Sequence, residues 1–92
     1  MNDTRLVILK NDLQMLTDSN DTYLNTLISM AERFIKEMGV KLVDGDIEDD
    51  GLVSMYAAWL FRKRAESENA MPRMLQYALR NRLMSEKMKV KK

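Results

Sequence analysis

The stretch "LNTLISMAERFIKEMG" (residues 24–39) decides the fold, because its apolar residues repeat at the spacing of a helix. Steps of three and four residues place side chains along one side of a helix with about 3.6 residues per turn. Seven side chains keep these steps: Leu24, Leu27, Ile28, Ala31, Phe34, Ile35 and Met38. Gly39 follows where a helix end often takes a left-handed residue. The stretch predicts a helix with a wide apolar face that must be buried.

The residues before this helix predict a shorter first helix and a turn. The same apolar spacing is kept by Leu6, Leu9, Leu13 and Leu16. We therefore expect a helix from Thr4 to about Leu16, with Asp3 or Thr4 as its N-cap. The polar residues 17–21 predict a turn. Three of them can cap the following helix: Ser19, Asn20 and Asp21.

The residues after Gly39 predict a short connection, an acidic loop and a third helix. Residues 40–43 are too few to assign and could form one strand-like step of the connection. The third helix is expected to begin within residues 47–50 and to run to about Glu66. Its apolar face is expected to hold Leu52, Met55, Tyr56, Trp59 and Leu60. Arg62 and Arg64 are expected on its other face, near the end where positive charge complements the helix dipole.

Pro72 predicts the start of a fourth helix, since proline suits the first helical position, where an N–H would make no intrahelical bond. It follows a break at residues 67–70. The inward face of this helix is expected to hold Leu75, either Tyr77 or Ala78, Leu79 and Leu83. The basic tail, residues 85–92, is expected to fray from Lys87 onward.

The length and composition predict one all-α domain, a small bundle of about four helices. The 92 residues, 46% of them hydrophobic, can supply one modest core over about residues 5–84. The expected core residues are Leu24, Leu27, Ile28, Ala31, Ile35, Tyr56, Trp59, Leu60, Leu75 and Leu79. A domain of this size leaves little room for a deep, enclosed active site.

The absence of cysteine and histidine narrows the function classes. It excludes disulfides, thiolate zinc sites, cysteine or serine–histidine nucleophiles and imidazole acid–base chemistry. The longest apolar run, residues 55–61, is too short for a membrane span, and the first residues do not resemble a signal peptide. We expect no cofactor, no membrane and no enzymatic activity.

The net charge of +1 hides opposite charges in the two parts of the chain. Residues 1–51 hold five Lys and Arg against eleven Asp and Glu, a net charge of −6. Residues 52–92 hold ten Lys and Arg against three Asp and Glu, a net charge of +7. Such asymmetry indicates either that copies of the chain pack against one another or that one part faces a polyanion.

The acidic loop has five carboxylates within seven positions: Asp44, Asp46, Glu48, Asp49 and Asp50. An EF-hand loop counted from Asp44 would need glycine at its sixth position and glutamate at its twelfth, where this chain has Asp49 and Met55. A pair of catalytic acids is also poorly supported, because nothing near them in the sequence would separate their pKa values. Two further readings stay open and are compatible: a solvated loop with an N-cap for the third helix, and a contact between subunits.

Arg73, Arg80 and Lys87 are spaced by seven residues, so they lie on nearly one stripe of the fourth helix. Such a stripe can follow a phosphate backbone without reading bases. It can equally be a solvated face, or contact the acidic part of another subunit. The connection between the last two helices lacks the glycine frequent in helix-turn-helix motifs.

The order of features resembles the small head-tail connector proteins of tailed bacteriophages and prophages over residues 5–83. A short helix with "LKNDL" (9–13) precedes an Asp-rich turn and a long helix with "LISMAERFI" (27–35). The resemblance is carried there by Leu9, Lys10, Leu13, Leu27, Ile28, Ala31 and Ile35. An aromatic-rich helix and a proline-initiated last helix complete it, with Tyr56, Trp59, Pro72, Leu75 and Arg80.

The resemblance implies a structural protein whose copies form a ring beneath the portal protein, extend the DNA channel and dock the tail or stopper proteins. It implies a place in the virion, at the head-tail junction, after synthesis in the bacterial cytoplasm. We hypothesise that the five loop acids contact basic residues of the adjacent subunit, namely Arg62, Lys63, Arg64 or Arg73. Arg73, Arg80 and Lys87 could also face double-stranded DNA in the channel. The alternative is a small DNA-binding helical protein, either a packaging subunit or a regulator.

Overall fold

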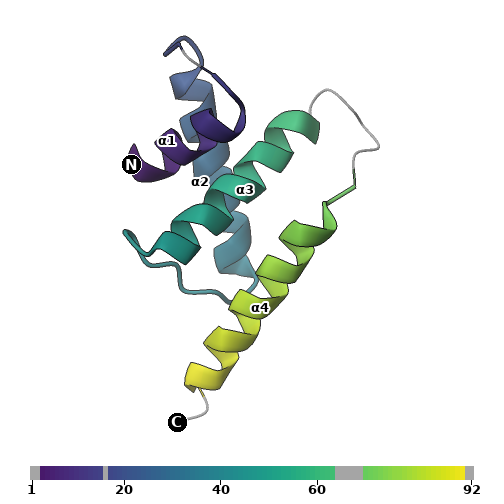
Figure 1. Cartoon of the computed structure of the whole chain (residues 1–92). Helices are drawn as coiled ribbons and strands as arrows, with labels where there is room; N and C mark the ends of the chain where they lie inside the picture. Colours follow the sequence, from purple (N-terminus) through teal and green to yellow (C-terminus); the bar gives the residue numbers. More distant parts are fainter. Residues whose placement is uncertain (1–2, 16, 64–69, 91–92) are drawn as a thin grey trace.

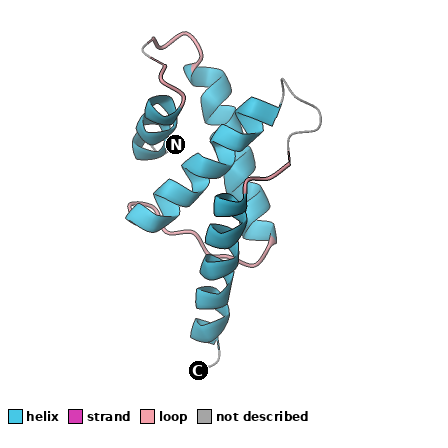
Figure 2. Ribbon diagram, turned by 45° about the vertical axis from the view of Figure 1, so that its right-hand side comes forward, coloured by secondary structure: helices cyan, strands magenta, loops and turns pink. Residues whose placement is uncertain are grey.

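The computed structural model describes residues 3–15, 17–63 and 70–90, and these residues form four α-helices and no strand. The helices are α1 (Asp3–Asp12), α2 (Asp21–Glu37), α3 (Ile47–Lys63) and α4 (Arg73–Val90). The prediction of an all-α bundle of about four helices is thereby confirmed. α3 packs against each of the other three helices, with α1 and α2 on one side and α4 on the other (Figure 1). The C-terminal turns of α4 extend beyond the rest of the bundle (Figure 2).

α1 begins at Asp3 and ends at Asp12, earlier than the predicted end at about Leu16. Gln14 adopts a left-handed conformation, with φ of 58°. The N–H of Gln14 donates to the Asn11 carbonyl at 3.1 Å, and the N–H of Met15 donates to the Lys10 carbonyl at 2.9 Å. These two bonds form a Schellman motif, which ends the helix. The left-handed residue of this motif is not a glycine, so the sequence does not indicate the end. Leu16 lies outside the described residues.

α2 ends in the same motif at the predicted glycine. Gly39 has φ of 108°, and its N–H donates to the Lys36 carbonyl at 3.0 Å. The N–H of Val40 donates to the Ile35 carbonyl at 3.4 Å, and both side chains are buried. The apolar contact that often accompanies a Schellman ending is therefore available here. At the other end, Asn20 is the N-cap residue, although its side chain makes no capping bond.

α3 is buried on more of its circumference than its sequence predicted. Asp46 caps its start by accepting hydrogen bonds from the N–H groups of Glu48, at 2.9 Å, and Asp49, at 3.2 Å. Its buried residues are Asp49, Asp50, Leu52, Val53, Ser54, Ala57 and Ala58. They surround much of the helix because α3 has neighbours on several sides. The predicted end at Glu66, and Arg64, lie outside the described residues.

α4 begins one residue after Pro72, whose carbonyl accepts the first helical hydrogen bond, from the N–H of Gln76. Leu75 and Leu79 are buried, Ala78 and Leu83 are half-buried, and Tyr77 is exposed. Of the two alternatives at this position, Ala78 is therefore the inward one. The helix continues to Val90, so the predicted fraying from Lys87 is not seen within the described residues.

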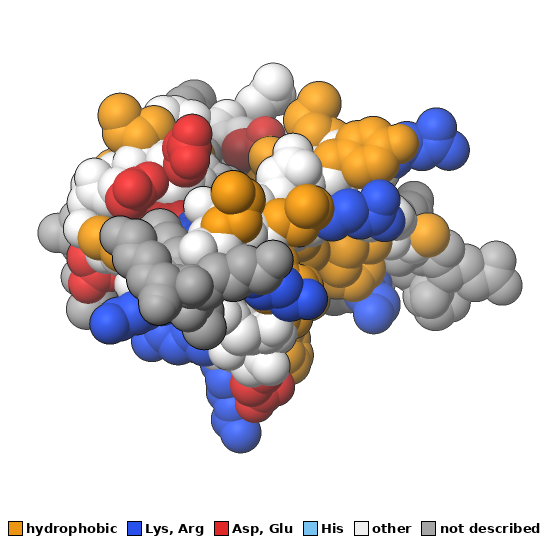
Figure 3. All heavy atoms as spheres, turned by 90° about the horizontal axis from the view of Figure 1, so that it is seen from below, with side chains coloured by type: hydrophobic (Ala, Val, Ile, Leu, Met, Phe, Trp, Pro, Cys, Tyr) orange, Lys and Arg blue, Asp and Glu red, His pale blue; other side chains and the backbone are white. Residues whose placement is uncertain are grey.

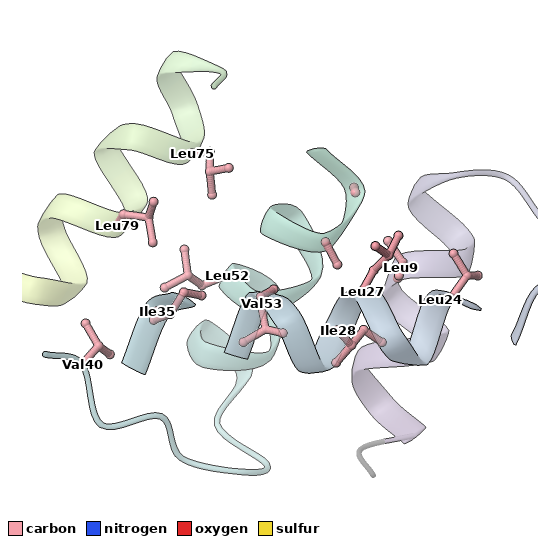
Figure 4. Packing of buried hydrophobic residues seen from close by; sticks show 13 residues of the cluster. Leu9, Leu24, Leu27, Ile28, Ile35, Val40, Leu52, Val53, Leu75 and Leu79 are labelled. Carbon is pink, nitrogen blue, oxygen red and sulfur yellow. The ribbon is translucent and has the colours of Figure 1, made fainter. Parts of the chain in front are cut away.

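The core runs through the interfaces that α3 makes with the other helices (Figure 4). Seven predicted core residues are buried: Leu24, Leu27, Ile28, Ala31, Ile35, Leu75 and Leu79. The other three, Tyr56, Trp59 and Leu60, are half-buried and pack against this cluster. The buried apolar residues that the core prediction did not include are Leu9, Val40, Leu52, Val53, Ala57 and Ala58.

Candidate functional site

The five acids of the loop fall into two groups with different surroundings. Asp49 and Asp50 are buried, with exposed fractions of 1% and 2%, whereas Asp44, Asp46 and Glu48 are exposed. The hypothesis that all five contact an adjacent subunit is therefore wrong for Asp49 and Asp50. Their partners are arginines of the same chain, and a buried carboxylate requires such a partner to remain charged.

The first partner is Arg5, whose side chain is 1% exposed. Its Nε donates to Asp50 Oδ1 at 2.6 Å, and its Nη1 donates to Glu32 Oε2 at 2.6 Å. Its Nη2 donates to the Val43 carbonyl at 3.4 Å and lies 3.5 Å from Asp44 Oδ1. This Arg5 cluster joins α1 to α2, to α3 and to the loop between them. Each ion pair crosses between elements, so it fixes their relative positions.

The Arg5 cluster is supported by one more buried hydrogen bond. The hydroxyl of Ser54 donates to the carbonyl of Arg5 at 3.0 Å. That carbonyl lies in the first turns of α1, whereas Ser54 lies on α3. Both the side chain and the backbone of Arg5 are therefore bonded to α3.

The second partner is Arg82 on α4, which binds Asp49 with two hydrogen bonds. Nε donates to Asp49 Oδ1 at 2.7 Å, and Nη2 donates to Asp49 Oδ2 at 3.3 Å. Nη1 donates to Glu86 Oε1 at 2.7 Å, and Nη2 also donates to the Lys41 carbonyl at 2.8 Å. Asp49 Oδ2 in turn accepts the N–H of Val43 at 2.9 Å. This Arg82 cluster holds α4 against the start of α3 and the preceding loop.

The ionisation of the Arg82 cluster follows from these contacts. Burial by itself would raise the pKa of Asp49, but the hydrogen bonds from Arg82 and from the N–H of Val43 outweigh burial and lower it. The hydrogen bond to Asp49 is the largest effect on Arg82 and raises the pKa of that guanidinium. Both groups are therefore charged at neutral pH, and neither is poised to exchange a proton there.

The sequence contained a signal for these arginines that counting apolar residues missed. Arg5 lies four residues before Leu9, and Arg82 lies three residues after Leu79. Both therefore occupy positions in the inward register of their helices. An arginine in that register needs a buried acid opposite it, and the loop supplies two.

Three of the other basic residues proposed for a subunit contact are described, and they lie elsewhere on the surface. Arg62 makes an exposed ion pair with Asp12 of α1, at 3.3 Å. Lys63 lies over the ring of Trp59, with its Nζ 4.9 Å from the ring centroid. Arg64 lies outside the described residues. Arg73 is exposed on α4.

Trp59 is one end of a short row of aromatic contacts that leads through Tyr56 to Phe34 of α2. The rings of Trp59 and Tyr56 are T-shaped to each other at a centroid separation of 5.6 Å, and the ring centroids of Tyr56 and Phe34 are 6.0 Å apart. Burial raises the pKa of the Tyr56 hydroxyl. The half-buried Trp59 ring packs against the core from α3, at the edge of the cluster in which it was expected.

The outward face of α4 carries an unusual set of exposed apolar side chains. Met74 and Met88 are 72% and 71% exposed, and Tyr77 and Met84 are also more than half exposed. With Asn81, which is exposed too, they form what we call the α4 stripe: Met74, Tyr77, Asn81, Met84 and Met88. Large apolar side chains gathered on one exposed face indicate an interaction surface.

The α4 stripe is bordered on one side by Arg73, Arg80 and Lys87, the basic edge. Each of the three immediately precedes a member of the stripe in the sequence. All three are exposed, and none makes an ion pair with another of the described residues. Their charge is therefore available to a partner.

On its other side the α4 stripe borders a groove of about 470 Å³ between α4 and the start of α3. Its lining on the α4 side includes Ala78, Asn81 and Ser85. On the α3 side it includes Ile47, which is 85% exposed, together with Asp46 and Glu48. Seen from below, apolar side chains lie between a group of acidic ones at the upper left and several basic ones at the right, and further basic side chains lie at the lower left (Figure 3).

The described part of the chain offers no set of three His, Cys, Asp or Glu side chains placed to hold a metal ion together. None of its described helices combines the length and the apolar character that crossing a bilayer requires.

Comparison of the chain with protein-family models, with curated proteins and with solved structures found no significant match.

Proposed function

We propose that this protein is a structural subunit that assembles with copies of itself, of the kind found in phage head-tail connectors. The observation that carries this proposal is the α4 stripe, an exposed apolar face with a basic edge on one side, unpaired among the described residues, and exposed acids beyond the other side. A face of this composition suits contact with protein better than contact with water.

The resemblance in the sequence gives the proposal its biological setting. In that setting the copies form a ring beneath the portal protein, extend the DNA channel and dock the tail or stopper proteins. The protein would act at the head-tail junction of a virion. The four-helix fold is compatible with this role, and the resemblance is what supports the finer assignment.

We further propose that the protein is not an enzyme. Among the described residues, the buried ionisable side chains are Arg5, Asp49 and Asp50, and they are engaged in ion pairs that hold helices together. Catalytic acids and bases are usually held near neutral pKa by burial or by like charges. The arginine beside Asp49 has the opposite effect on its pKa.

The proposal is tested by the mass of the protein in solution, measured by multi-angle light scattering from micromolar to millimolar concentration, with and without duplex DNA. We expect large oligomers that grow with protein concentration and are indifferent to DNA. A chain that remains monomeric over the whole range would contradict the proposal.

A second function, non-specific binding of double-stranded DNA, is favoured by the basic edge alone. Its three cations are exposed, unpaired among the described residues and spaced by seven residues along one helix. The expected signature is a steep loss of affinity with salt and little dependence on sequence. Tight binding of a monomer to DNA would favour this function over assembly, whereas absence of binding at low salt would eliminate it.

A further inference from the structure

The α4 stripe has the spacing of a coiled-coil seam. Its members follow one another by three, four, three and four residues, which places Met74, Asn81 and Met88 at a positions and Tyr77 and Met84 at d positions of a heptad. All five are exposed, so the seam has no partner within the described part of the chain. A helix with such a seam pairs with another helix.

Asn81 lies at the centre of the seam, at an a position. A single asparagine at an a position is known to fix register and the number of strands, because it is satisfied best by another asparagine at the same level. Such pairing at one level requires no acidic or basic partner. It favours a second copy of this helix as the occupant.

The two edges of the seam differ in charge and size. The basic edge, Arg73, Arg80 and Lys87, occupies the g positions. The opposite edge has the small residues Ala78 and Ser85 at e positions, and it opens onto the groove whose far side carries the acids Asp46 and Glu48. A neighbouring helix can therefore approach closely on the e side and find negative charge there.

These edges also determine the direction of the partner helix. Two parallel helices place the g edge of one against the e edge of the other, so basic side chains face the acidic groove. Two antiparallel helices place like edges together, which would bring the basic edges of both copies into contact. Like charges placed opposite each other are unfavourable, so the parallel arrangement is favoured.

We propose that the α4 stripe binds the α4 stripe of a second copy of this chain in parallel, with the basic edge of one copy against the acidic groove of the other. This inference rests on the proposed function, since it names the surface by which copies meet. In such a parallel pair the two stripes face each other and both edges of each copy are used, so this contact closes as a dimer, and a ring requires a further contact between the pairs. A seam of little more than two heptads makes each contact weak and dependent on concentration.

Single cysteines test the arrangement directly, because the protein has none of its own. The variants are Met74→Cys, Met88→Cys and, as a control, Arg33→Cys at an exposed position of α2 away from the stripe. Each full-length variant is treated with a short bis-maleimide reagent at a concentration where light scattering shows oligomers. Parallel pairing predicts cross-linked dimers of Met74→Cys alone and of Met88→Cys alone, at least tenfold more than for the control.

Other cross-linking outcomes would overturn the inference. Cross-links that form only when Met74→Cys and Met88→Cys are mixed would show antiparallel helices. Oligomers in which neither variant cross-links above the control would place the contact elsewhere and leave the proposed function intact. Absence of any oligomer, for the wild-type chain as well, would overturn the proposed function and this inference together.

Charge reversal tests the pairing of the two edges. Arg80→Glu and Glu48→Lys should each raise the concentration needed for assembly about tenfold, because each places like charges across the contact. Combined in one chain, they should restore assembly toward that of the wild type. If the combined variant assembles no better than the single ones, the acidic groove is not the partner of the basic edge.

Discussion

Arg80 and Arg82 lie two residues apart on α4, yet their surroundings have nothing in common. Arg82 donates four hydrogen bonds, to Asp49, Glu86 and the Lys41 carbonyl, and holds α4 to α3. Arg80 is exposed and pairs with none of the described residues. A separation of two residues is more than half a turn of a helix. Of these two identical side chains, that of Arg82 therefore faces the interior and that of Arg80 faces the solvent.

The same contrast recurs in the acidic loop. Asp49 is buried against Arg82, whereas its neighbour Glu48 is exposed beside the groove. The opposite charges of the two parts of the chain therefore fall into two groups, an inner group that is buried and an outer group that is exposed. The inner charges hold the helices of one copy together, and we propose that the outer charges guide one copy to another.

The largest expected effect is a difference in stability between variants of Arg82 and of Arg80. Arg82→Ala should lower the free energy of unfolding by about 3–5 kcal/mol, because it leaves the buried Asp49 without its ion-pair partner. Arg80→Ala should change it by no more than about 0.5 kcal/mol, as is usual for exposed residues. Urea denaturation of both variants at dilute concentration measures the difference. Equal losses for both would refute the division into inner and outer charges.

The next effect concerns pH and the two neighbouring acids. The pKa of Asp49 in the folded chain lies below its ordinary value of 3.8. Between the lowered pKa of the folded chain and the ordinary pKa of 3.8, the unfolded chain therefore binds more protons than the folded chain. The stability that this ion pair contributes is fully present above pH 3.8, and it is lost as the pH falls through the folded pKa of Asp49.

Urea denaturation from pH 7 downward measures this loss of stability. Asp49→Asn should remove part of the acid-dependent loss, at the cost of lower stability at pH 7, because an amide pairs less strongly with Arg82. Glu48→Gln is the matched control and should keep the wild-type pH dependence. A control that flattens the curve as much as Asp49→Asn would contradict the assignment.

A smaller difference in stability is expected between variants of two exposed acids, Asp46 and Glu48. Asp46→Ala should lower the free energy of unfolding by about 1 kcal/mol, because its carboxylate caps α3. Glu48→Ala should leave it nearly unchanged, since Glu48 is exposed and only its backbone N–H contacts Asp46. Thermal unfolding followed by circular dichroism resolves this difference. A stable Asp46→Ala variant would show that the cap contributes little.

Helical periodicity predicted the four helices and most of the core, because an apolar face can be read one helix at a time. The end of α1 could not be predicted in this way. The Schellman motif at the end of α2 could be predicted from Gly39. The same motif at the end of α1 uses Gln14, and glutamine rarely adopts a positive φ. The hydrogen bonds define that stop, and they are not visible in composition.

The candidate site was predicted in part, for a related reason. Local spacing identified the basic edge, and the loop was expected to supply an N-cap and a contact with basic residues. The ion pairs of Arg5 with Asp50 and of Arg82 with Asp49 span 45 and 33 residues. Pairings over such distances depend on how the helices pack, so a sequence read locally cannot distinguish the inner acids from the outer ones.

We propose that the outward charges of α4 serve assembly and not folding. The most direct test is Arg80→Glu, with its mass measured by light scattering at high concentration and its stability measured at a dilution where the copies are separate. We expect a smaller mass than that of the wild type and an unchanged free energy of unfolding. An unchanged mass, or a variant that unfolds more readily than the wild type, would contradict it.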